Sequence, residues 1–217
     1  VAALLEGRIA RYKHPKEVVF VGEKDKIREE IVRLSADESR LSIADAPDAV
    51  GMGDGVFAIR RKKRSSIRVG VQMVKDGLAD AFVSMGNTAA VVYASRSILG
   101  SLQGVNKPAL SLIIPALKGH TLLLDVGANA NCQPEDLLQF AVMGKVFMEQ
   151  VMGIPNPRIA LMSIGEEEGK GNELTKQAFE RLSTAPLNFI GNVEGKDLYA
   201  GKAEVIVSDG FTGNVAL

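Results

Sequence analysis

Short, continuously apolar segments alternate with amphipathic segments along this chain, and that alternation constrains the fold more than any other feature. Segments that are apolar at every position are typical of strands buried on both faces of a parallel sheet. Apolar residues at helical spacing, such as Ile27, Ile31 and Leu34, predict helices between them. The sequence therefore predicts an α/β fold whose mostly parallel sheet carries helices on both sides.

The same patterns set the expected boundaries. Strands are expected at residues 17–22, 40–45, 79–84, 109–114, 121–126, 158–164, 187–191 and 203–208. Helices are expected at residues 24–34, 56–62, 67–77, from the turn at 86–87 to about Leu102, at 134–152 and at 173–182. The longest of these helices opens with Pro134, a residue favoured at the first helical position.

Nothing in the chain marks a boundary between domains, because it contains no internal repeat, low-complexity tract or linker-like stretch. A single α/β domain over residues 1–217 is the simplest interpretation, and two lobes that share one sheet are the alternative. Both ends look cut. Residues 1–11 are helix-like from the first residue, and residues 208–217 stop in the first turn of a helix. A natural domain seldom stops there, because helix nucleation is unfavourable unless further turns follow. We expect a domain that is incomplete at both ends.

Composition excludes several classes of function. The chain has 26 Lys and Arg against 26 Asp and Glu, so it lacks the global cationic surface of a nucleic-acid-binding protein. No apolar run approaches the ~18 residues that span a bilayer. Cys132 is the only cysteine, so an internal disulfide is impossible, which favours a reducing, cytoplasmic compartment.

Glycine is enriched, with 22 of 217 residues against a usual ~7%, and four glycine-containing turns join an expected strand to the next helix. These turns are residues 84–90, 125–137, 163–176 and 208–214. Each combines Gly with Asn, Thr or Asp, and free N–H groups at a helix start favour an anion. Capping explains any one of them, but four together favour a phosphate-type site beyond the carboxyl ends of the strands.

Known nucleotide motifs fit these turns poorly. The segment 165–171, Gly-Glu-Glu-Glu-Gly-Lys-Gly, has fewer residues between its first two glycines than a P-loop requires, and Gly171 replaces the Ser or Thr that holds magnesium. No Gly-x-Gly-x-x-Gly follows an early strand, and no His/Cys cluster has zinc spacing. We therefore expect no cofactor and no metal.

Single reactive residues are also few. His14 and His120 lie outside the four turns and are more typical of surface residues than of general bases. Cys132 lies in a candidate turn, but a buried, inert thiol is the better interpretation. Asp125 fits capping better than metal binding, because no second positioned carboxylate accompanies it. Lys170 lies among glycines at a helix start and is either an anion ligand or a solvated lysine.

The strongest local charge feature is a basic run at residues 60–64. A solvated helix face is the default interpretation of such a run. An acidic protein partner, an anionic lipid and a phosphate group are the functional alternatives, and the sequence does not choose among them.

Six motifs, in order along the chain, resemble those of the bacterial acyl-carrier-protein:phosphate acyltransferases, the PlsX family. They are Arg-Arg-Lys-Lys-x-Ser-Ser at 60–66, Ser-x-Gly-Asn-Thr at 84–88, Leu-Leu-Asp-Val-Gly-Ala-Asn at 123–129, Lys-Gly-Asn-Glu-Leu-Thr-Lys at 170–176, Phe-Ile-Gly-Asn-Val-Glu at 189–194 and Asp-Gly-Phe-Thr-Gly-Asn at 209–214. The chain departs from the family's usual Ala, Gly and Ala at Met85, Ala89 and Ala90. Family members open with a further strand and Gly-rich turn and continue past Leu217, which accounts for the cut ends.

The resemblance implies a three-layer α/β/α sandwich with a mostly parallel sheet, similar to isocitrate and isopropylmalate dehydrogenases and to phosphotransacetylases. It implies conversion of acyl-[acyl carrier protein] and inorganic phosphate to acyl phosphate and carrier protein, for bacterial phospholipid synthesis. The implied partners are acyl carrier protein, inorganic phosphate and a second copy of the chain, with peripheral contact to the membrane or to a membrane acyltransferase. No nucleic-acid partner is expected.

Phosphate is itself the nucleophile in that reaction, so the turns need no Ser, Cys or His nucleophile. We expect Lys170 to bind and steer phosphate, and Asn214 with the N–H groups around Gly213 to stabilise the oxyanion. The expected substrate- and phosphate-binding residues are Gly86, Asn87, Thr88, Asp125, Gly127, Asn129, Asn172, Glu173, Asp209, Thr212 and Gly213. The expected docking residues for the carrier protein are Arg60, Arg61, Lys62, Lys63 and Arg64.

Two other kinds of function remain open. One is another enzyme of the same fold: a phosphotransacetylase that uses acyl-CoA, or a metal- and NAD-dependent hydroxy-acid dehydrogenase. The dehydrogenase needs clustered metal-binding Asp residues, which the sequence does not show. The other is a non-catalytic scaffold that senses phosphate or lipid.

Overall fold

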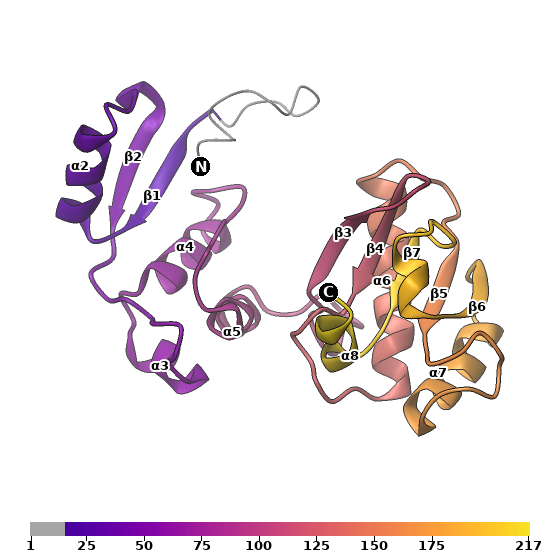
Figure 1. The fold of residues 1–217 in the computed structure, drawn as a ribbon. Helices are drawn as coiled ribbons and strands as arrows, with labels where there is room; N and C mark the ends of the chain where they lie inside the picture. The colour runs from indigo at the N-terminus through magenta and orange to yellow at the C-terminus, as the bar shows by residue number, and fades with distance from the viewer. Residues whose placement is uncertain (1–15) are drawn as a thin grey trace. The chain divides into compact units, whose positions relative to one another are not determined.

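The computed structural model describes residues 16–217 (Figure 1). The helical start expected for residues 1–11, and His14, lie outside this range. The chain divides into two compact units, and the boundary in the sequence falls between Gly100 and Ser101. The described strands form two sheets, one in each unit. The single domain over residues 1–217 stays a prediction.

A small parallel sheet begins the first unit. Strand β1 (Val18–Gly22) pairs along its whole length with β2 (Leu41–Asp45). Helix α2 (Lys24–Arg33) and the 3-10 helix η1 (Glu38–Arg40) form the crossover that a parallel pair requires. Both strands and the helix expected between residues 17 and 45 are therefore confirmed.

Three further helices complete the first unit: α3 (Val56–Arg61), α4 (Ser66–Lys75) and α5 (Thr88–Ile98). Local sequence explains where two of them start, because the side chains of Ser65 and Asn87 cap α4 and α5 by accepting a backbone N–H. The helices pack through apolar side chains. The buried members of this cluster are Ile59, Ile67, Val71, Ala90, Ala94 and Ile98.

The strand predicted for residues 79–84 is wrong, because no strand forms there. The largest apolar side chain of this segment, Phe82, packs instead against the helices. A Cβ atom on Gly70 of α4 would lie 2.3 Å from the Phe82 ring. A strand also needs a neighbour for its N–H and C=O groups, and the sheet of this unit contains only β1 and β2 among the described residues.

Five strands form the sheet of the second unit, in the spatial order β3-β4-β7-β5-β6. Strand β3 runs antiparallel to β4, and all other neighbours are parallel. Leu122 and Leu124 of β4 belong to one buried cluster and Leu123 to another, so both faces of the strand are covered. This explains why such strands are apolar at every position. The bounds are β3 (Ser111–Pro115), β4 (His120–Leu124), β5 (Ile159–Met162), β6 (Phe189–Val193) and β7 (Val205–Val207).

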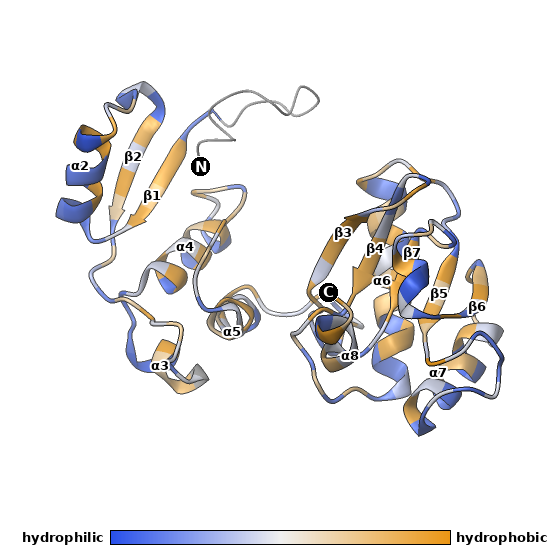
Figure 2. Ribbon diagram, in the orientation of Figure 1, coloured by the Kyte–Doolittle hydropathy of each residue, from blue (hydrophilic) through white to orange (hydrophobic). Residues whose placement is uncertain are grey.

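Helical elements cover both faces of this sheet. Helices α6 (Pro134–Gln150) and α7 (Glu173–Thr184) contribute to the cluster on one face. The 3-10 helix η2 (Gly195–Leu198) and Ala216, which directly follows α8 (Gly210–Val215), contribute to the other. Figure 2 shows the strands as the most continuously hydrophobic segments. The predicted α/β fold with a mostly parallel, helix-flanked sheet is confirmed.

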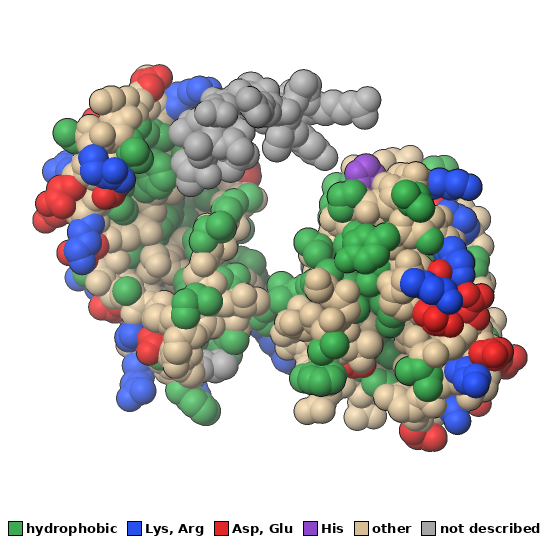
Figure 3. All heavy atoms as spheres, viewed as in Figure 1, with side chains coloured by type: hydrophobic (Ala, Val, Ile, Leu, Met, Phe, Trp, Pro, Cys, Tyr) green, Lys and Arg blue, Asp and Glu red, His purple; other side chains and the backbone are tan. Residues whose placement is uncertain are grey.

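The surface carries both signs of charge. Figure 3 shows acidic and basic side chains intermixed on the visible face of each unit. Within residues 16–217, no helix is both long enough and apolar enough to cross a membrane.

Candidate active site

Three of the four glycine-containing turns follow neighbouring strands of the five-stranded sheet. Residues 125–137 follow β4, residues 208–214 follow β7, and residues 163–176 follow β5. Since β4, β7 and β5 are parallel neighbours in that order, their carboxyl ends lie at one edge. The structure thus brings these turns together at the edge where open α/β sheets bind ligands.

Asp125 organises the turn after β4. Its buried carboxylate accepts five hydrogen bonds of 2.8–3.1 Å. The donors are the backbone N–H groups of Leu110, Gly127, Ala128 and Asn129 and the side-chain amide of Asn129. The amide nitrogen of Asn129 also donates to the Pro108 carbonyl at 2.7 Å. Asp125 and Asn129 therefore hold the turn in shape.

Helix α8 packs its backbone directly on this turn. A Cβ atom on Gly213 would lie 1.9 Å from the carbonyl oxygen of Asp125, and one on Gly210 would lie 2.9 Å from the backbone nitrogen and oxygen of Asn129. The Gly210 N–H donates to the Asn129 carbonyl at 2.8 Å. The glycines of this motif therefore serve a close approach between two turns.

The first N–H groups of α8 are already paired. The Asp209 carboxylate accepts from Phe211 and Thr212 at 3.0 and 2.9 Å, and from the Thr212 hydroxyl at 2.7 Å. The Gly213 N–H donates to the Asp209 carbonyl at 2.9 Å. Asp209 and Thr212 thus form the helix cap, and the backbone donors expected to face a substrate are occupied within the chain.

The side chain of Asn214 differs from these capping groups because it is exposed. Its amide nitrogen lies 3.4 Å from the Val126 carbonyl, a long hydrogen bond. It would lie 3.0 Å from a Cβ atom on Gly127, whose φ of +137° also favours glycine. Gly127 therefore makes room for the Asn214 amide, which can donate a second hydrogen bond to a ligand.

Lys170 combines a fixed backbone with an exposed side chain. Its N–H donates to the Glu167 carbonyl at 3.0 Å, and its carbonyl accepts from the Ser163 hydroxyl at 3.3 Å. A Cβ atom on buried Gly165 would lie 3.0 Å from the Lys170 Cγ. Across residues 16–217 the ammonium group has no ion-pair partner. A positive charge is therefore available to an anion at this edge of the sheet.

The residues after Lys170 start helix α7. Asn172 caps it by accepting from the Thr175 N–H at 2.9 Å. Glu173 accepts from the Gln177 amide one turn later. Gly171 has a φ of +109°, and a Cβ atom there would lie 2.0 Å from the Thr175 hydroxyl oxygen. Asn172 and Glu173 are therefore engaged in local structure.

The fourth turn lies in the first unit, before α5. Asn87 is buried; its Oδ1 accepts from the Ala90 N–H, and its amide nitrogen lies 3.1–3.2 Å from three carbonyl oxygens of the loop at 51–54. The Gly86 N–H donates to the Ser84 hydroxyl at 3.1 Å. Thr88, the first residue of α5, is exposed. Asn87 therefore fixes this turn, and Thr88 is the side chain it presents to solvent.

The basic run is partly neutralised within its own unit. Lys62 pairs with Asp54 at 2.7 Å, and Arg64 pairs with Asp45 at 2.9 Å. Arg60, Arg61 and Lys63 are exposed and have no ion pair in the described part of the chain. These three residues are therefore the ones able to meet an acidic partner.

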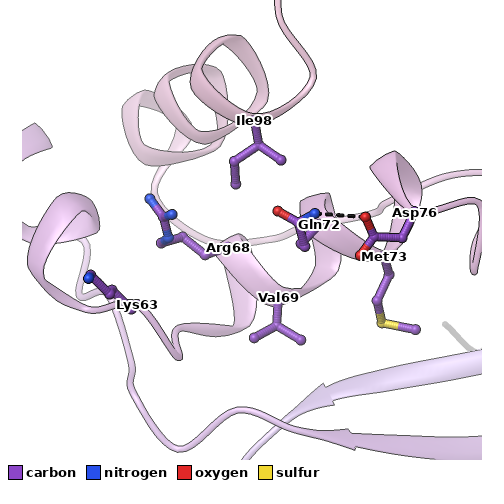
Figure 4. A pocket seen from close by; sticks show the side chains of 7 residues that line it. All are labelled: Lys63, Arg68, Val69, Gln72, Met73, Asp76 and Ile98. Carbon is purple, nitrogen blue, oxygen red and sulfur yellow. Dashed lines mark hydrogen bonds between the residues drawn. The ribbon is translucent and has the colours of Figure 1, made fainter.

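A cavity of about 210 Å³ adjoins the end of this run (Figure 4). It is lined by Lys63, Arg68, Val69, Gln72, Met73, Asp76 and Ile98. Lys63 and Arg68 lie at one end, and Met73 and Asp76 lie at the other. The Gln72 amide donates to the Asp76 carboxylate at 2.8 Å. The cations of this region therefore border a partly apolar hollow between α4 and α5.

The other reactive side chains considered from the sequence, those of His120 and Cys132, do not serve as a general base or a nucleophile at this edge of the sheet. His120 is exposed at the start of β4, opposite the end that carries Asp125. Burial raises the pKa of the Cys132 thiol to about 11, so the thiol stays protonated at neutral pH. Residues 16–217 contain no group of three or more His, Cys, Asp or Glu side chains that could hold a metal ion.

The site residues expected from the sequence omit two residues that contact the Lys170 loop. The Asn192 amide donates to the Glu167 carbonyl, and Lys202 pairs with Glu166. Asn192 had a signal, since it follows Gly191 near the carboxyl end of a strand. Lys202 had none, because its contact spans 36 residues of sequence.

Solved structures define the class of fold. The chain is similar to a EutD phosphotransacetylase from Staphylococcus aureus, with a TM-score of 0.61 and 14% identity, over 92% of this chain and 72% of that one. It is also similar to a branched-chain phosphotransacylase from Enterococcus faecalis, with a TM-score of 0.57 and 14% identity, over 99% of this chain and 77% of that one. The chain therefore shares its fold with these two structures.

Sequence relatives define the family. The model of the family described as "Fatty acid synthesis protein" matches residues 1–217, and the chain belongs to this family. A phosphate acyltransferase from Desulforamulus reducens is 49% identical over 203 residues, covering 92% of this chain and 60% of its own length. One from Heliobacterium modesticaldum is 50% identical over 203 residues, covering 93% and 61%. The resemblance noted from the motifs is confirmed, and the chain spans about 60% of the length of these relatives.

Proposed function

We propose that the protein of which this chain is part transfers an acyl group from acyl-[acyl carrier protein] to inorganic phosphate, supplying acyl phosphate for phospholipid synthesis. The observation that carries the proposal is the position of Lys170. Its ammonium group has no ion-pair partner within residues 16–217 and lies in the turn after β5, in a chain 49% identical to a phosphate acyltransferase. Inorganic phosphate is an anion that such a group attracts.

The chemistry needs positioning more than a protein nucleophile. A phosphate oxygen attacks the thioester carbonyl carbon, the C–S bond breaks, and the carrier's thiolate leaves and takes up a proton. A thiol with a pKa near ~8.5 leaves without strong acid assistance. Lys170 binds and steers phosphate toward the carbonyl, which turns a bimolecular encounter into an oriented one.

The oxyanion of the tetrahedral intermediate needs a hydrogen-bond donor, and the Asn214 amide supplies it. The backbone N–H groups of Phe211, Thr212 and Gly213 already pair with Asp209, so the side chain is the available donor. Asp125 and Asn129 support the turn on which α8 rests. In the first unit, Asn87 supports its own turn, and the exposed Thr88 hydroxyl is able to bind a phosphate group.

The partners follow from the same reaction. The acidic carrier protein docks on the basic run through Arg60, Arg61 and Lys63, while Lys62 and Arg64 hold their own loop through Asp54 and Asp45. The protein acts as a homodimer, and peripheral contact with the membrane or with a membrane acyltransferase passes the product on to phospholipid synthesis. Acyl-CoA is the alternative donor, favoured by the likeness to a phosphotransacetylase fold.

The test uses full-length protein with palmitoyl-carrier protein and phosphate, and acyl phosphate is trapped as the hydroxamate. Wild type should form it, and Lys170→Ala should lose most turnover. Lys118→Ala removes an exposed lysine before the opposite end of β4 and should behave like wild type. Equal turnover with palmitoyl-CoA would favour the alternative donor. Phosphate binding without product would favour a sensing scaffold, and wild-type turnover in Lys170→Ala would remove the proposed role of Lys170.

A further inference from the structure

Side chains from other parts of the chain bind two consecutive residues, Glu166 and Glu167, of the loop that carries Lys170. The carbonyl oxygen of Glu167 accepts from the amide nitrogen of Asn192 at 3.0 Å and from the backbone N–H of Lys170 at 3.0 Å. Asn192 and Lys170 therefore share one acceptor atom. The side chain of Asn192 touches the loop one hydrogen bond away from the lysine backbone.

Asn192 is an unusual group for its position near the end of β6. Only 7% of the residue is exposed. Its Oδ1 atom is buried and has no hydrogen-bond partner in the described part of the chain. A buried acceptor without a partner costs stability, and native structures hold few of them. The contribution of this side chain therefore lies in the bond that its amide nitrogen makes to the loop.

Lys202 holds the preceding residue of the loop. Its ammonium group donates to the Glu166 carboxylate at 2.8 Å and to the Asp197 carboxylate at 2.9 Å. The Asp197 side chain is only 3% exposed and also accepts from the Glu194 N–H at 2.9 Å, at the start of η2. Lys202 therefore ties an exposed loop residue to a buried and fixed carboxylate.

Inside the loop, little freedom remains between these anchors and the lysine. Glycine at position 165 allows the Lys170 side chain to lie across the loop backbone, since a Cβ atom there would lie 3.0 Å from Lys170 Cγ. On the other side, the Ser163 hydroxyl donates to the Lys170 carbonyl at 3.3 Å. A displacement at Glu166 or Glu167 therefore moves Lys170.

We propose that Asn192 and Lys202 are positioning residues for phosphate binding, which act by fixing the loop that presents Lys170. This inference rests on the proposed role of Lys170. Neither residue contacts phosphate in this scheme. Loss of either anchor should weaken phosphate binding about tenfold or more, because small displacements of a binding group are costly. KM for phosphate should rise, and turnover at saturating phosphate should change less.

The chain offers a matched control for each anchor. Asn192→Asp keeps the shape but replaces the donating amide, and Asn188→Asp makes the same change just before β6, where the Asn188 amide donates to the Asn156 carbonyl at 3.0 Å. Lys202→Met removes the double anchor. Lys196→Met removes a nearby lysine whose one ion pair among residues 16–217 is with Glu194, at 3.0 Å. Lys202→Arg keeps the charge and should restore most binding.

Three measurements on full-length protein test the proposal: calorimetric titration with inorganic phosphate, hydrogen exchange of the peptide spanning residues 163–172, and the phosphate KM. Asn192→Asp and Lys202→Met should bind phosphate weakly and exchange faster in this loop, while both controls match wild type. Unchanged phosphate affinity in the two anchor variants, with affinity lost in Lys170→Ala, would overturn the inference and leave the proposed function intact. Absence of acyl phosphate from wild type would overturn the function, whereas a selective loss of phosphate binding would still support the inference. Circular dichroism confirms folding, and Asn192→Asp carries the test alone if Lys202→Met fails to fold.

Discussion

Replacing Gly213 with alanine sets two physical effects of opposite sign against each other. Alanine is favoured over glycine inside a helix by about 1 kcal/mol, so helix propensity alone predicts a more stable protein. Packing predicts the reverse. The added Cβ atom would lie 1.9 Å from the Asp125 carbonyl oxygen and 2.7 Å from the Ser208 hydroxyl, well inside the 3.0 Å that real Cβ contacts respect.

The obstacle is backbone, so it cannot be relieved by a rotamer change. Helix α8 must move away from the Asp125 turn, which strains the 2.8 Å hydrogen bond from Gly210 to Asn129. Overpacking costs about 1–3 kcal/mol, and a backbone clash at 1.9 Å should lie at the upper end, about 2–3 kcal/mol, which outweighs the gain in propensity. We expect a net loss of about 1–2 kcal/mol in the free energy of unfolding. Because Asn214 moves with α8, acyl phosphate formation should fall as well.

Equilibrium urea unfolding, followed by circular dichroism, measures the change as a shift of midpoint at constant slope. Gly169→Ala is the matched control, because nothing lies within 4 Å of a Cβ atom there. Its stability should stay within about 0.5 kcal/mol of wild type. A Gly213→Ala protein as stable as wild type, or more stable, would refute the close packing of α8 on the turn.

Three further predictions concern buried groups. Asp125→Asn places an amide among five hydrogen-bond donors, so the free energy of unfolding measured in a urea titration should fall by about 3 kcal/mol. The control Asp76→Asn changes a surface residue and should alter the free energy of unfolding by less than about 0.5 kcal/mol. Burial would raise the pKa of Asp197, but the hydrogen bond from Lys202 holds it below the ordinary 3.8. The ionised Asp197 carboxylate therefore stabilises the fold above pH 3.8, and this stabilisation is lost as the pH falls through the lower pKa of the folded protein. On acidification, the melting temperature of wild type should fall more than that of Asp197→Asn. Equal falls in the two melting temperatures would contradict this prediction. Burial raises the pKa of the Cys132 thiol to about 11. At pH ~8, iodoacetamide should therefore label Cys132 slowly in native protein and quickly in urea. Equal labelling rates would show that the thiol is accessible in the native protein.

Strands were predicted correctly where a continuously apolar segment is enough to identify a buried strand. The prediction failed where strand formation also requires a distant pairing partner. The centres of β4, β5 and β7, at Leu122–Leu124, Ile159–Met162 and Val205–Val207, are continuously apolar because both faces of the sheet are buried there. Residues 79–84 carry a similar pattern, yet Phe82 packs among helices and no neighbouring strand is present in the described part of the unit. Pairing depends on a distant segment, which the residues themselves do not encode.

The candidate site shows the same division. The sequence located the glycine-containing turns, and Asp209, Asn172 and Asn87 are all cap residues that local rules can recognise. It did not indicate that the N–H groups beginning α8 are occupied, which leaves the Asn214 amide as the available donor. Nor did it reveal that Lys62 and Arg64 are neutralised by Asp54 and Asp45.

By itself, the sequence determined the α/β class, most helix and strand boundaries, and the family. These properties depend on periodicity, capping and ordered motifs, which act over a few residues. Only the tertiary structure decided the strand order that gathers three turns at one edge, the fit of Gly213 against Asp125, and the link from Asn192 and Lys202 to the Lys170 loop. Those features are hydrogen bonds and close contacts between residues far apart in the chain, and they exist only once the backbone has brought those residues together.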